Sequence, residues 1–260
     1  MLTSETIAHR IVSKALKKAI TQDTKSDMKN AKQDERFVSI MVNNIFEDII
    51  MRDRDNEISK VYNYIVGFPS TTVRLLRDLN VIRWLFGDLT FLNIPVNINR
   101  NEGTLCQRAE YDWGCSVVRK ILPGFDSKQW TTKFGETLAK EIYELLGHTV
   151  ETSVPTIDHL HPDVLTSTHV VEAKTQTYYT TGTAGEKILG VPFKYADVPV
   201  LFGKPLHILC IGCAEKKCRE DYGNLSGDRT TDRKKAFIEF YKSMGIEFKA
   251  ATDTLVSLVS

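Results

Sequence analysis

Apolar residues in the first 120 or so positions recur mainly at helical spacing. From Ile7 to Ile20 they follow an i, i+3/i+4 pattern behind Thr3 and Ser4, which is typical of a capped amphipathic helix. Residues Phe37 to Met51 are dense in isoleucine, valine and methionine and predict a buried helix. Further helices are predicted from a Ser70 cap, after Pro69, through Leu79 and Leu85, and from Thr104 to Leu122, before Pro123-Gly124.

The pattern changes near Pro123. Residues Ser127 to Leu146 carry one apolar stripe, and Gly147 stands where a helix C-terminal cap belongs. Strands are predicted at His148 to Val154, Asp163 to Leu165, Thr168 to Thr175 and Leu206 to Ile211, and a last helix from a cap at Asp228 to Met244. This order of elements predicts an α/β fold with a mixed central sheet flanked by helices, in residues 124–260, after a mainly helical part, residues 1–123.

Composition narrows the class of protein. Of the 260 residues, 42% are hydrophobic and 26% charged, as in ordinary globular proteins, and the formal net charge is +1. Any affinity for nucleic acid must therefore come from a local basic cleft. The start lacks a signal-peptide pattern, no apolar run approaches a membrane span, and the cysteine count is odd, at five. These features predict a cytoplasmic protein without a disulfide scaffold.

Two carboxylates and a lysine stand close together in the second part of the chain. The sequence His161-Pro162-Asp163 is followed, after eight residues, by Glu172-Ala173-Lys174. In an extended strand Glu172, Lys174 and Gln176 share one side, while Val171 and Ala173 take the other. A short hairpin would bring Asp163 beside them. Such a set can hold a divalent cation and orient a water against a phosphate.

This arrangement resembles the signature of the PD-(D/E)XK nuclease superfamily, and in particular type II restriction endonucleases. The resemblance rests on Pro162-Asp163 and Glu172-Ala173-Lys174, behind a helix that carries Phe134-Gly135-Glu136, and covers about Ser127 to Cys213. It implies a restriction-endonuclease-like core in residues 124–260, with the helical part used for dimerisation or DNA contact. It also implies a sequence-specific, metal-dependent endonuclease that cuts duplex DNA to 5′-phosphate and 3′-hydroxyl ends.

The resemblance implies roles for single residues. Asp163 and Glu172 would hold Mg²⁺ with the backbone carbonyl of Ala173, and Glu136 would reach the ion through water. Lys174 would position or deprotonate the attacking water and offset charge on the scissile phosphate. DNA contacts are expected from Gln176, Tyr178, Thr181, Lys187 and Lys194.

The same resemblance implies a set of partners. These are double-stranded DNA, a second copy in a two-fold homodimer that reads a palindrome, and a cognate DNA methyltransferase in the same system, with no membrane. Two other interpretations stay open: a repair, recombination or junction-resolving nuclease of the same superfamily, and a non-catalytic or zinc-stabilised DNA-binding module. The lack of a GxxxxGK[ST] motif favours a stand-alone restriction enzyme, and the intact trio of Asp163, Glu172 and Lys174 favours catalysis.

Several other groups compete for attention. Glu215-Lys216-Lys217 and Glu247-Phe248-Lys249 repeat the Glu-x-Lys spacing. His207, Cys210, Cys213 and Cys218 have zinc-like spacing. We expect no zinc, because Cys210 should fill a core strand, Cys213 should belong to it or end it, and Cys218 should lie in the polar loop after it.

Histidines and basic residues near these segments also have alternative interpretations. His159, His161 and His169 are expected to be polar loop residues near a cleft rather than ligands. The densest basic cluster lies at the start of the last predicted helix and could either grip DNA phosphates or form a solvated helix face. Its members are Arg229, Arg233, Lys234 and Lys235.

Overall fold

The structure is a computed structural model that describes residues 53–92, 94, 102–126, 129–179 and 186–260. The chain divides into two compact units, Met1–Asn56 and Glu57–Ser260. The helices predicted over Ile7 to Ile20 and Phe37 to Met51 lie outside the described residues. The second unit contains the sheet, and the division predicted near residue 123 falls inside this unit.

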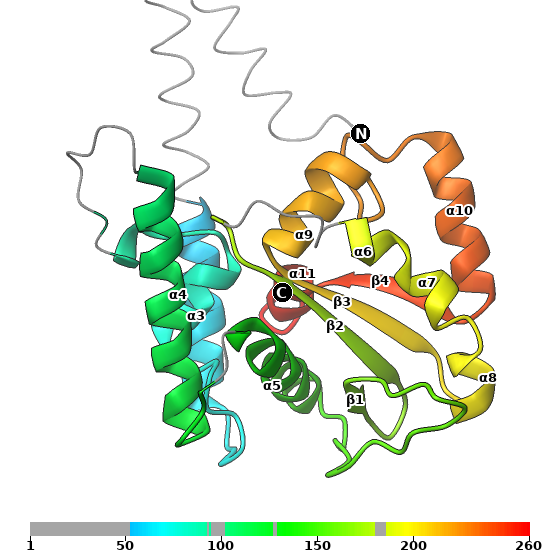
Figure 1. Cartoon of the computed structure of the whole chain (residues 1–260), viewed down its shortest axis with the longest axis horizontal. Helices are drawn as coiled ribbons and strands as arrows, with labels where there is room; N and C mark the ends of the chain where they lie inside the picture. The colour runs from blue at the N-terminus through cyan, green and yellow to red at the C-terminus, as the bar shows by residue number, and fades with distance from the viewer. Residues whose placement is uncertain (1–52, 93, 95–101, 127–128, 180–185) are drawn as a thin grey trace, which may run out of the picture. The chain divides into compact units, whose positions relative to one another are not determined.

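The second unit is built on a mixed sheet. Among the described residues it has four strands in the order β1 (Val164–Leu165), β2 (Val170–Gln176), β3 (Leu206–Gly212) and β4 (Ile246–Ala250) (Figure 1). β1 and β2 form an antiparallel hairpin with Val164 opposite Val171. β2, β3 and β4 are parallel neighbours, and their connections contain helices, as crossovers between parallel strands usually do.

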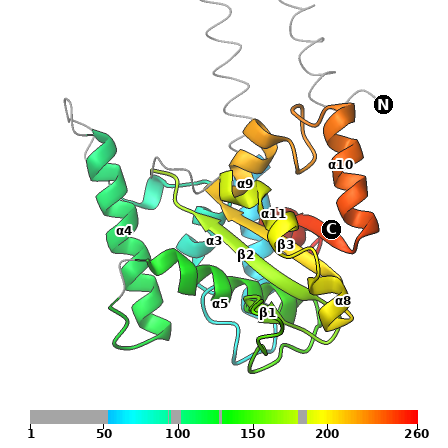
Figure 2. The ribbon, with the colours of Figure 1, turned by 45° about the vertical axis from the view of Figure 1, so that its right-hand side comes forward.

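Helices cover both faces of this sheet and confirm the predicted α/β class (Figures 1 and 2). One apolar core joins Val171 and Leu209 to α3 (Leu79–Leu85), α4 (Glu102–Ile121), α5 (Trp130–Leu145), α11 (Ala251–Val256) and helical residues 57–67. A second core joins Val170 and Ile208 to residues in α6 (Glu186–Leu189), α7 (Val191–Lys194), α8 (Val198–Phe202), α9 (Cys213–Lys217) and the π-helical turn η2 (Cys218–Tyr222). Two further elements are the 3-10 turn η1 (Thr90–Leu92) and α10 (Asp232–Ser243).

Close packing fixes α5 against β2. A Cβ atom at Gly135 would collide with the side chain of Thr175 on β2, so only glycine allows the helix to approach this far. One residue earlier, Phe134 is fully buried, and its ring packs edge-on against Trp84 and Trp130 with centroids 5.3 and 5.1 Å apart. The helix turn that carries Glu136 is therefore held directly beside the predicted catalytic strand.

The start of α3 corrects the sequence prediction. The helix begins at Leu79, and its cap is Asp78, whose side chain accepts a hydrogen bond from the Asn80 N–H. Ser70 instead organises a turn, because its hydroxyl accepts from the N–H groups of Thr72 and Val73. The buried carboxylate of Glu141 on α5 accepts from the N–H groups of residues 74, 75 and 76, which satisfies this stretch outside a helix.

Other boundaries also differ from the prediction. Residues His148 to Val154 form no strand and make only an isolated bridge at Val150, whereas β4 was not predicted. α10 starts after a Thr231 cap rather than at Asp228, because the Thr231 side chain accepts from the Lys234 N–H. Among the described residues, no helix has the length and apolar character needed to cross a membrane.

Candidate active site

The β1–β2 hairpin brings the predicted acid residues together. Asp163 directly precedes β1, and its Oδ2 accepts a hydrogen bond from the Ala173 N–H on β2 at 2.8 Å. Because Val164 and Val171 are opposite each other, this bond locks the carboxylate to the centre of the second strand. The proline before Asp163 is buried, so the turn that delivers the carboxylate is part of the packed structure.

Glu172 and Lys174 share one side of β2, as strand alternation predicts. The Lys174 Nζ lies 2.5 Å from Glu172 Oε1, and the two side chains are 27% and 4% exposed. The other oxygen, Glu172 Oε2, is buried without a hydrogen-bond partner among the described residues. A buried carboxylate oxygen without a partner is rare in folded proteins and often indicates an ion or water that completes the site.

Glu136 on α5 adds a third carboxylate. Its negative charge raises the pKa of Asp163, which places the two groups within electrostatic reach. Glu136 Oε2 is also 2.6 Å from the Nζ of Lys133, one turn earlier on the same helix. Gly135, next to Glu136, packs against Thr175 and Ala173, so this turn of α5 lies beside the strand that carries Glu172 and Lys174.

The electrostatic interactions within this group disfavour the ionised form of Asp163. The pKa of Asp163 is raised to about 6, first by burial, then by the negative charge of Glu172 and, more weakly, of Glu136. The Ala173 N–H and the Lys174 ammonium oppose this shift and do not cancel it. A bound cation would relieve the repulsion among these carboxylates.

Tyr195, just after α7, is an additional residue that sequence reasoning did not assign. It is 4% exposed, and its hydroxyl accepts a hydrogen bond from Lys194 Nζ at 3.1 Å. Burial, then the charge of Glu172, raises the pKa of Tyr195, so its hydroxyl stays protonated beside the carboxylate. No sequence signal separates this tyrosine from a core residue, because it stands between the buried Val191 and Val198.

The residues predicted to contact DNA have varied surroundings. Gln176 is 5% exposed, with both side-chain amide atoms buried and without hydrogen-bond partners among the described residues. The ring of Tyr178 packs against Trp84 at 5.5 Å, and its hydroxyl donates to the Leu85 carbonyl, so this side chain belongs largely to the core. Lys187 is exposed on α6, Lys194 lies over the Tyr195 ring, and Thr181 is outside the described residues.

The competing Glu-x-Lys sets have structural explanations. Glu215 is buried, and its carboxylate accepts hydrogen bonds from Arg219 and from the Thr252 N–H and hydroxyl, which ties α9 to α11. Glu247 and Lys249 form an ion pair of 2.8 Å on β4. Neither glutamate is adjacent to a second carboxylate in the manner of Asp163 and Glu172.

The cysteine-histidine set predicted from spacing does not converge. Cys210 on β3 and Cys218 on η2 are both fully buried, with sulfur atoms 3.5 Å apart, while Cys213 begins α9. Cys218 therefore belongs to the core and not to a polar loop, because the chain turns into η2 against β3 rather than leaving the sheet. His207 lies on the opposite face of β3, where its Nδ1 is 2.5 Å from the Tyr143 hydroxyl. The absence of zinc stays a prediction.

The predicted loop histidines separate into two groups. His159 and His161 are exposed. His169 instead joins His148 and His207 in a cluster with Tyr143, which we call the histidine cluster, and the rings of His169 and His207 are only 4.1 Å apart. Burial and the neighbouring positive groups lower the pKa of His207 to about 3 and also lower that of His169.

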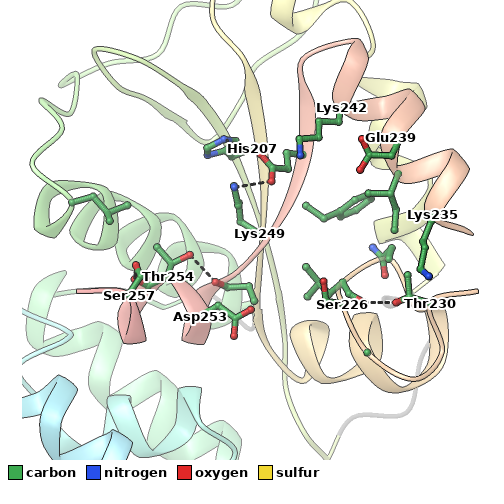
Figure 3. A pocket seen from close by; sticks show the side chains of 18 of the residues that line it. His207, Ser226, Thr230, Lys235, Glu239, Lys242, Lys249, Asp253, Thr254 and Ser257 are labelled. Carbon is green, nitrogen blue, oxygen red and sulfur yellow. Dashed lines mark hydrogen bonds and ion pairs between the residues drawn. The ribbon is translucent and has the colours of Figure 1, made fainter. Parts of the chain in front are cut away.

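Part of this cluster borders the large open cavity drawn in Figure 3. Tyr143, His207 and the Glu247–Lys249 pair line about 840 Å³ of space between α10, β4 and α11, with Lys235 and Lys242 on the α10 side. Neither Asp163 nor Glu172 lines this cavity, so the cavity lies apart from the acidic site.

The donor atoms of the acidic site suit a hard cation. Asp163 and Glu172 offer carboxylate oxygens with one oxygen unpaired, and Mg²⁺ needs only one or two carboxylates because it keeps several waters. Among the described residues, no three side chains of histidine, cysteine, aspartate or glutamate form a ready-made metal cage. The ligand set expected for Mg²⁺ differs from such a cage, because it combines two carboxylates with a backbone carbonyl. Comparisons with protein-family models, curated proteins and solved structures find no match.

Proposed function

We propose that this protein is a divalent-metal-dependent DNA endonuclease with a restriction-endonuclease-like core. The observation that carries the proposal is the convergence of Asp163, Glu172 and Lys174 on one hairpin, with Glu136 supplied by the adjacent helix. The four-stranded mixed sheet and the helix before it are compatible with that core. The match in residue types and the geometry support each other, since hydrolysis of a phosphodiester needs both charge neutralisation and an oriented water.

Each residue has a chemical task in this proposal. Asp163 and Glu172, with the Ala173 carbonyl, would hold Mg²⁺, and Glu136 would support them. The ion, when bound, would supply an acidified water and stabilise charge on the phosphate. Lys174, which is paired with Glu172, would offset the negative charge of the scissile phosphate. Tyr195 keeps its proton beside the Glu172 carboxylate.

We further propose duplex DNA as the substrate and a type II restriction enzyme as the biological role. A homodimer would cut both strands of a palindromic site, and a methyltransferase would protect the host DNA. A repair, recombination or junction-resolving nuclease would use the same hairpin chemistry. The two roles differ in what they cut, because a restriction enzyme yields defined fragments from ordinary duplex DNA.

Digestion of phage DNA tests this proposal. The full chain is incubated with unmodified and with branched duplex DNA in Mg²⁺, and the products are separated by electrophoresis. Discrete fragments from linear duplex DNA support the restriction role, and cutting confined to branched DNA supports the junction-resolving role. Cleavage of neither DNA, with Mn²⁺ also failing, contradicts the nuclease proposal. For variants of the acidic residues, the control is Glu239→Gln on exposed α10. Glu215→Gln is unsuitable as that control because Glu215 is structural.

A further inference from the structure

We propose that Lys133 on α5 is a phosphate-binding residue that exchanges its ion pair with Glu136 for the phosphodiester of the substrate. The inference rests on the proposed nuclease function and adds a residue that the sequence motif does not include. Lys133 lies one helical turn before Glu136, and the Nζ to Oε2 distance is 2.6 Å. Gly135, the residue before Glu136, lies against Thr175 and Ala173 of β2, so this ion pair is held beside the strand that carries Lys174.

The two lysines of the site differ in exposure. The side chain of Lys174 is 27% exposed and bonds to a glutamate that is almost fully enclosed. The side chain of Lys133 is 50% exposed and its partner Glu136 is 23% exposed. A phosphate that approaches from solvent would meet the more open pair first. Lys174 is thus suited to the reacting centre, and Lys133 to capture of the incoming DNA strand.

Replacing the ion pair with Glu136 by a contact with phosphate costs little free energy. An ion pair this exposed contributes little to stability in water, because water competes for both groups. A phosphate oxygen offers Lys133 an equivalent charge-assisted bond, and releasing counterions from DNA adds a further driving force. The carboxylate of Glu136 is then freed next to Asp163, at the place where the proposal for function needs an outer-shell ligand.

The balance of charges at the site also supports a phosphate-binding role for Lys133. The carboxylates of Asp163, Glu172 and Glu136 repel the phosphates of DNA, and Lys133 is one of the lysines that offset them, with Lys174 and with Lys194 beside Tyr195. Removal of Lys133 would increase that repulsion at the solvent side, where the substrate enters. The cation-rich start of α10 was the basic cluster favoured by sequence density, but it lies near the large cavity and outside this group of residues.

The test is the salt dependence of DNA binding by the full chain. Affinity for a fluorescent duplex is measured by anisotropy over a series of salt concentrations, with Ca²⁺ in place of Mg²⁺ so that the DNA stays intact. Lys133→Gln removes the charge, Lys133→Arg keeps it, and Lys133→Ala is a second neutral variant with a good helix former. The matched control is Lys140→Gln, because Lys140 is on the same helix about two turns further along.

The expected result is specific to one phosphate contact. Lys133→Gln and Lys133→Ala lower the slope of log affinity against log salt by about 0.9, whereas Lys133→Arg and Lys140→Gln keep the wild-type slope. An unchanged slope in both neutral variants, with wild-type binding intact, overturns this inference and leaves the proposed function standing. Wild-type protein that fails to bind duplex DNA overturns both.

Discussion

The two faces of β2 and β3 carry groups of opposite electrostatic character. On one face, Glu172 and Lys174 lie beside Asp163, whose pKa is raised first by burial and then by the negative charge of Glu172. On the other face, His169 and His207 stack in the histidine cluster, where burial favours their neutral forms. One set of strands therefore supports a charged group poised for a cation and a neutral group that contributes to packing. The comparison shows that titratable residues on the same strands can have different roles although they lie close together.

The largest expected effect is the loss of DNA cleavage when residues on the acidic face, which carries Asp163, Glu172 and Lys174, are replaced. Asp163→Ala, Glu172→Ala and Lys174→Ala should each reduce DNA cleavage by more than about 100-fold, because even residues behind metal ligands commonly contribute 10- to 100-fold. The measurement is the rate of cleavage, with the melting temperature recorded for each variant. Near-normal cleavage by any one variant removes that residue from the proposed mechanism. Glu247→Ala, from the second Glu-x-Lys set, should retain activity.

Metal dependence gives the next effect. Cleavage should require Mg²⁺ or Mn²⁺ and be supported poorly by Ca²⁺, because the larger calcium ion binds carboxylates in looser geometry and acidifies water less. Rates are compared at equal concentrations of each ion and after removal of metal with EDTA. Cutting that persists in EDTA would separate the activity from the acidic site altogether.

The stability of the fold should change when the charge of Asp163 on the acidic face is removed. The folded pKa of Asp163, about 6, is above its ordinary value of 3.8, so the ionised group destabilises the metal-free fold above pH 6 and this cost disappears as the pH falls toward 4. Asp163→Asn should therefore raise the melting temperature at pH 8 and lose that advantage at pH 4. Asp228→Asn, at an exposed position, is the control. A lower melting temperature at pH 8 would contradict an unfavourable ionised form of Asp163 in the fold.

The opposite face should respond to acid with the opposite sign. Because the folded pKa of His207 is lowered to about 3, the unfolded chain takes up the proton first, and stability is lost as the pH falls below about 6.5, by at most about 1.4 kcal/mol per pH unit. His207→Gln should make this loss shallower between pH 6.5 and 5. Denaturant unfolding at several pH values measures it, with exposed His161→Gln as the control. An unchanged slope would show that His207 does not govern acid stability.

The sequence predicted the elements whose periodicity is strong and local. The apolar stripe of α5 and the alternation of β2 were sufficient to place Glu136, Glu172 and Lys174 on the correct elements and sides. The approach of Asp163 to β2 also followed from the short hairpin, whereas the hydrogen bond that it accepts from the Ala173 N–H was not predicted. For these residues, the spacing in the sequence determines the geometry.

Features that depend on distant segments were missed. The start of α3 is set by Glu141, more than 60 residues later, whose carboxylate satisfies three N–H groups outside a helix. The histidine cluster combines positions 169 and 207, which the parallel register of β2 and β3 brings together, with His148, which the bridge between Val150 and Thr166 brings alongside. β4 has just five residues, and its alternating charges resemble those of an exposed segment. Tertiary packing decides each of these cases.

Titration of the purified protein with Mn²⁺ tests the central claim most directly, because it needs no knowledge of the DNA site. Calorimetry should detect one Mn²⁺-binding site in the wild-type chain that is lost in both Asp163→Ala and Glu172→Ala, while His207→Gln binds as the wild type does. Absence of binding to the wild type with and without duplex DNA, or binding that is unchanged when both carboxylates are removed, would contradict the claim that this hairpin is a metal-dependent active site.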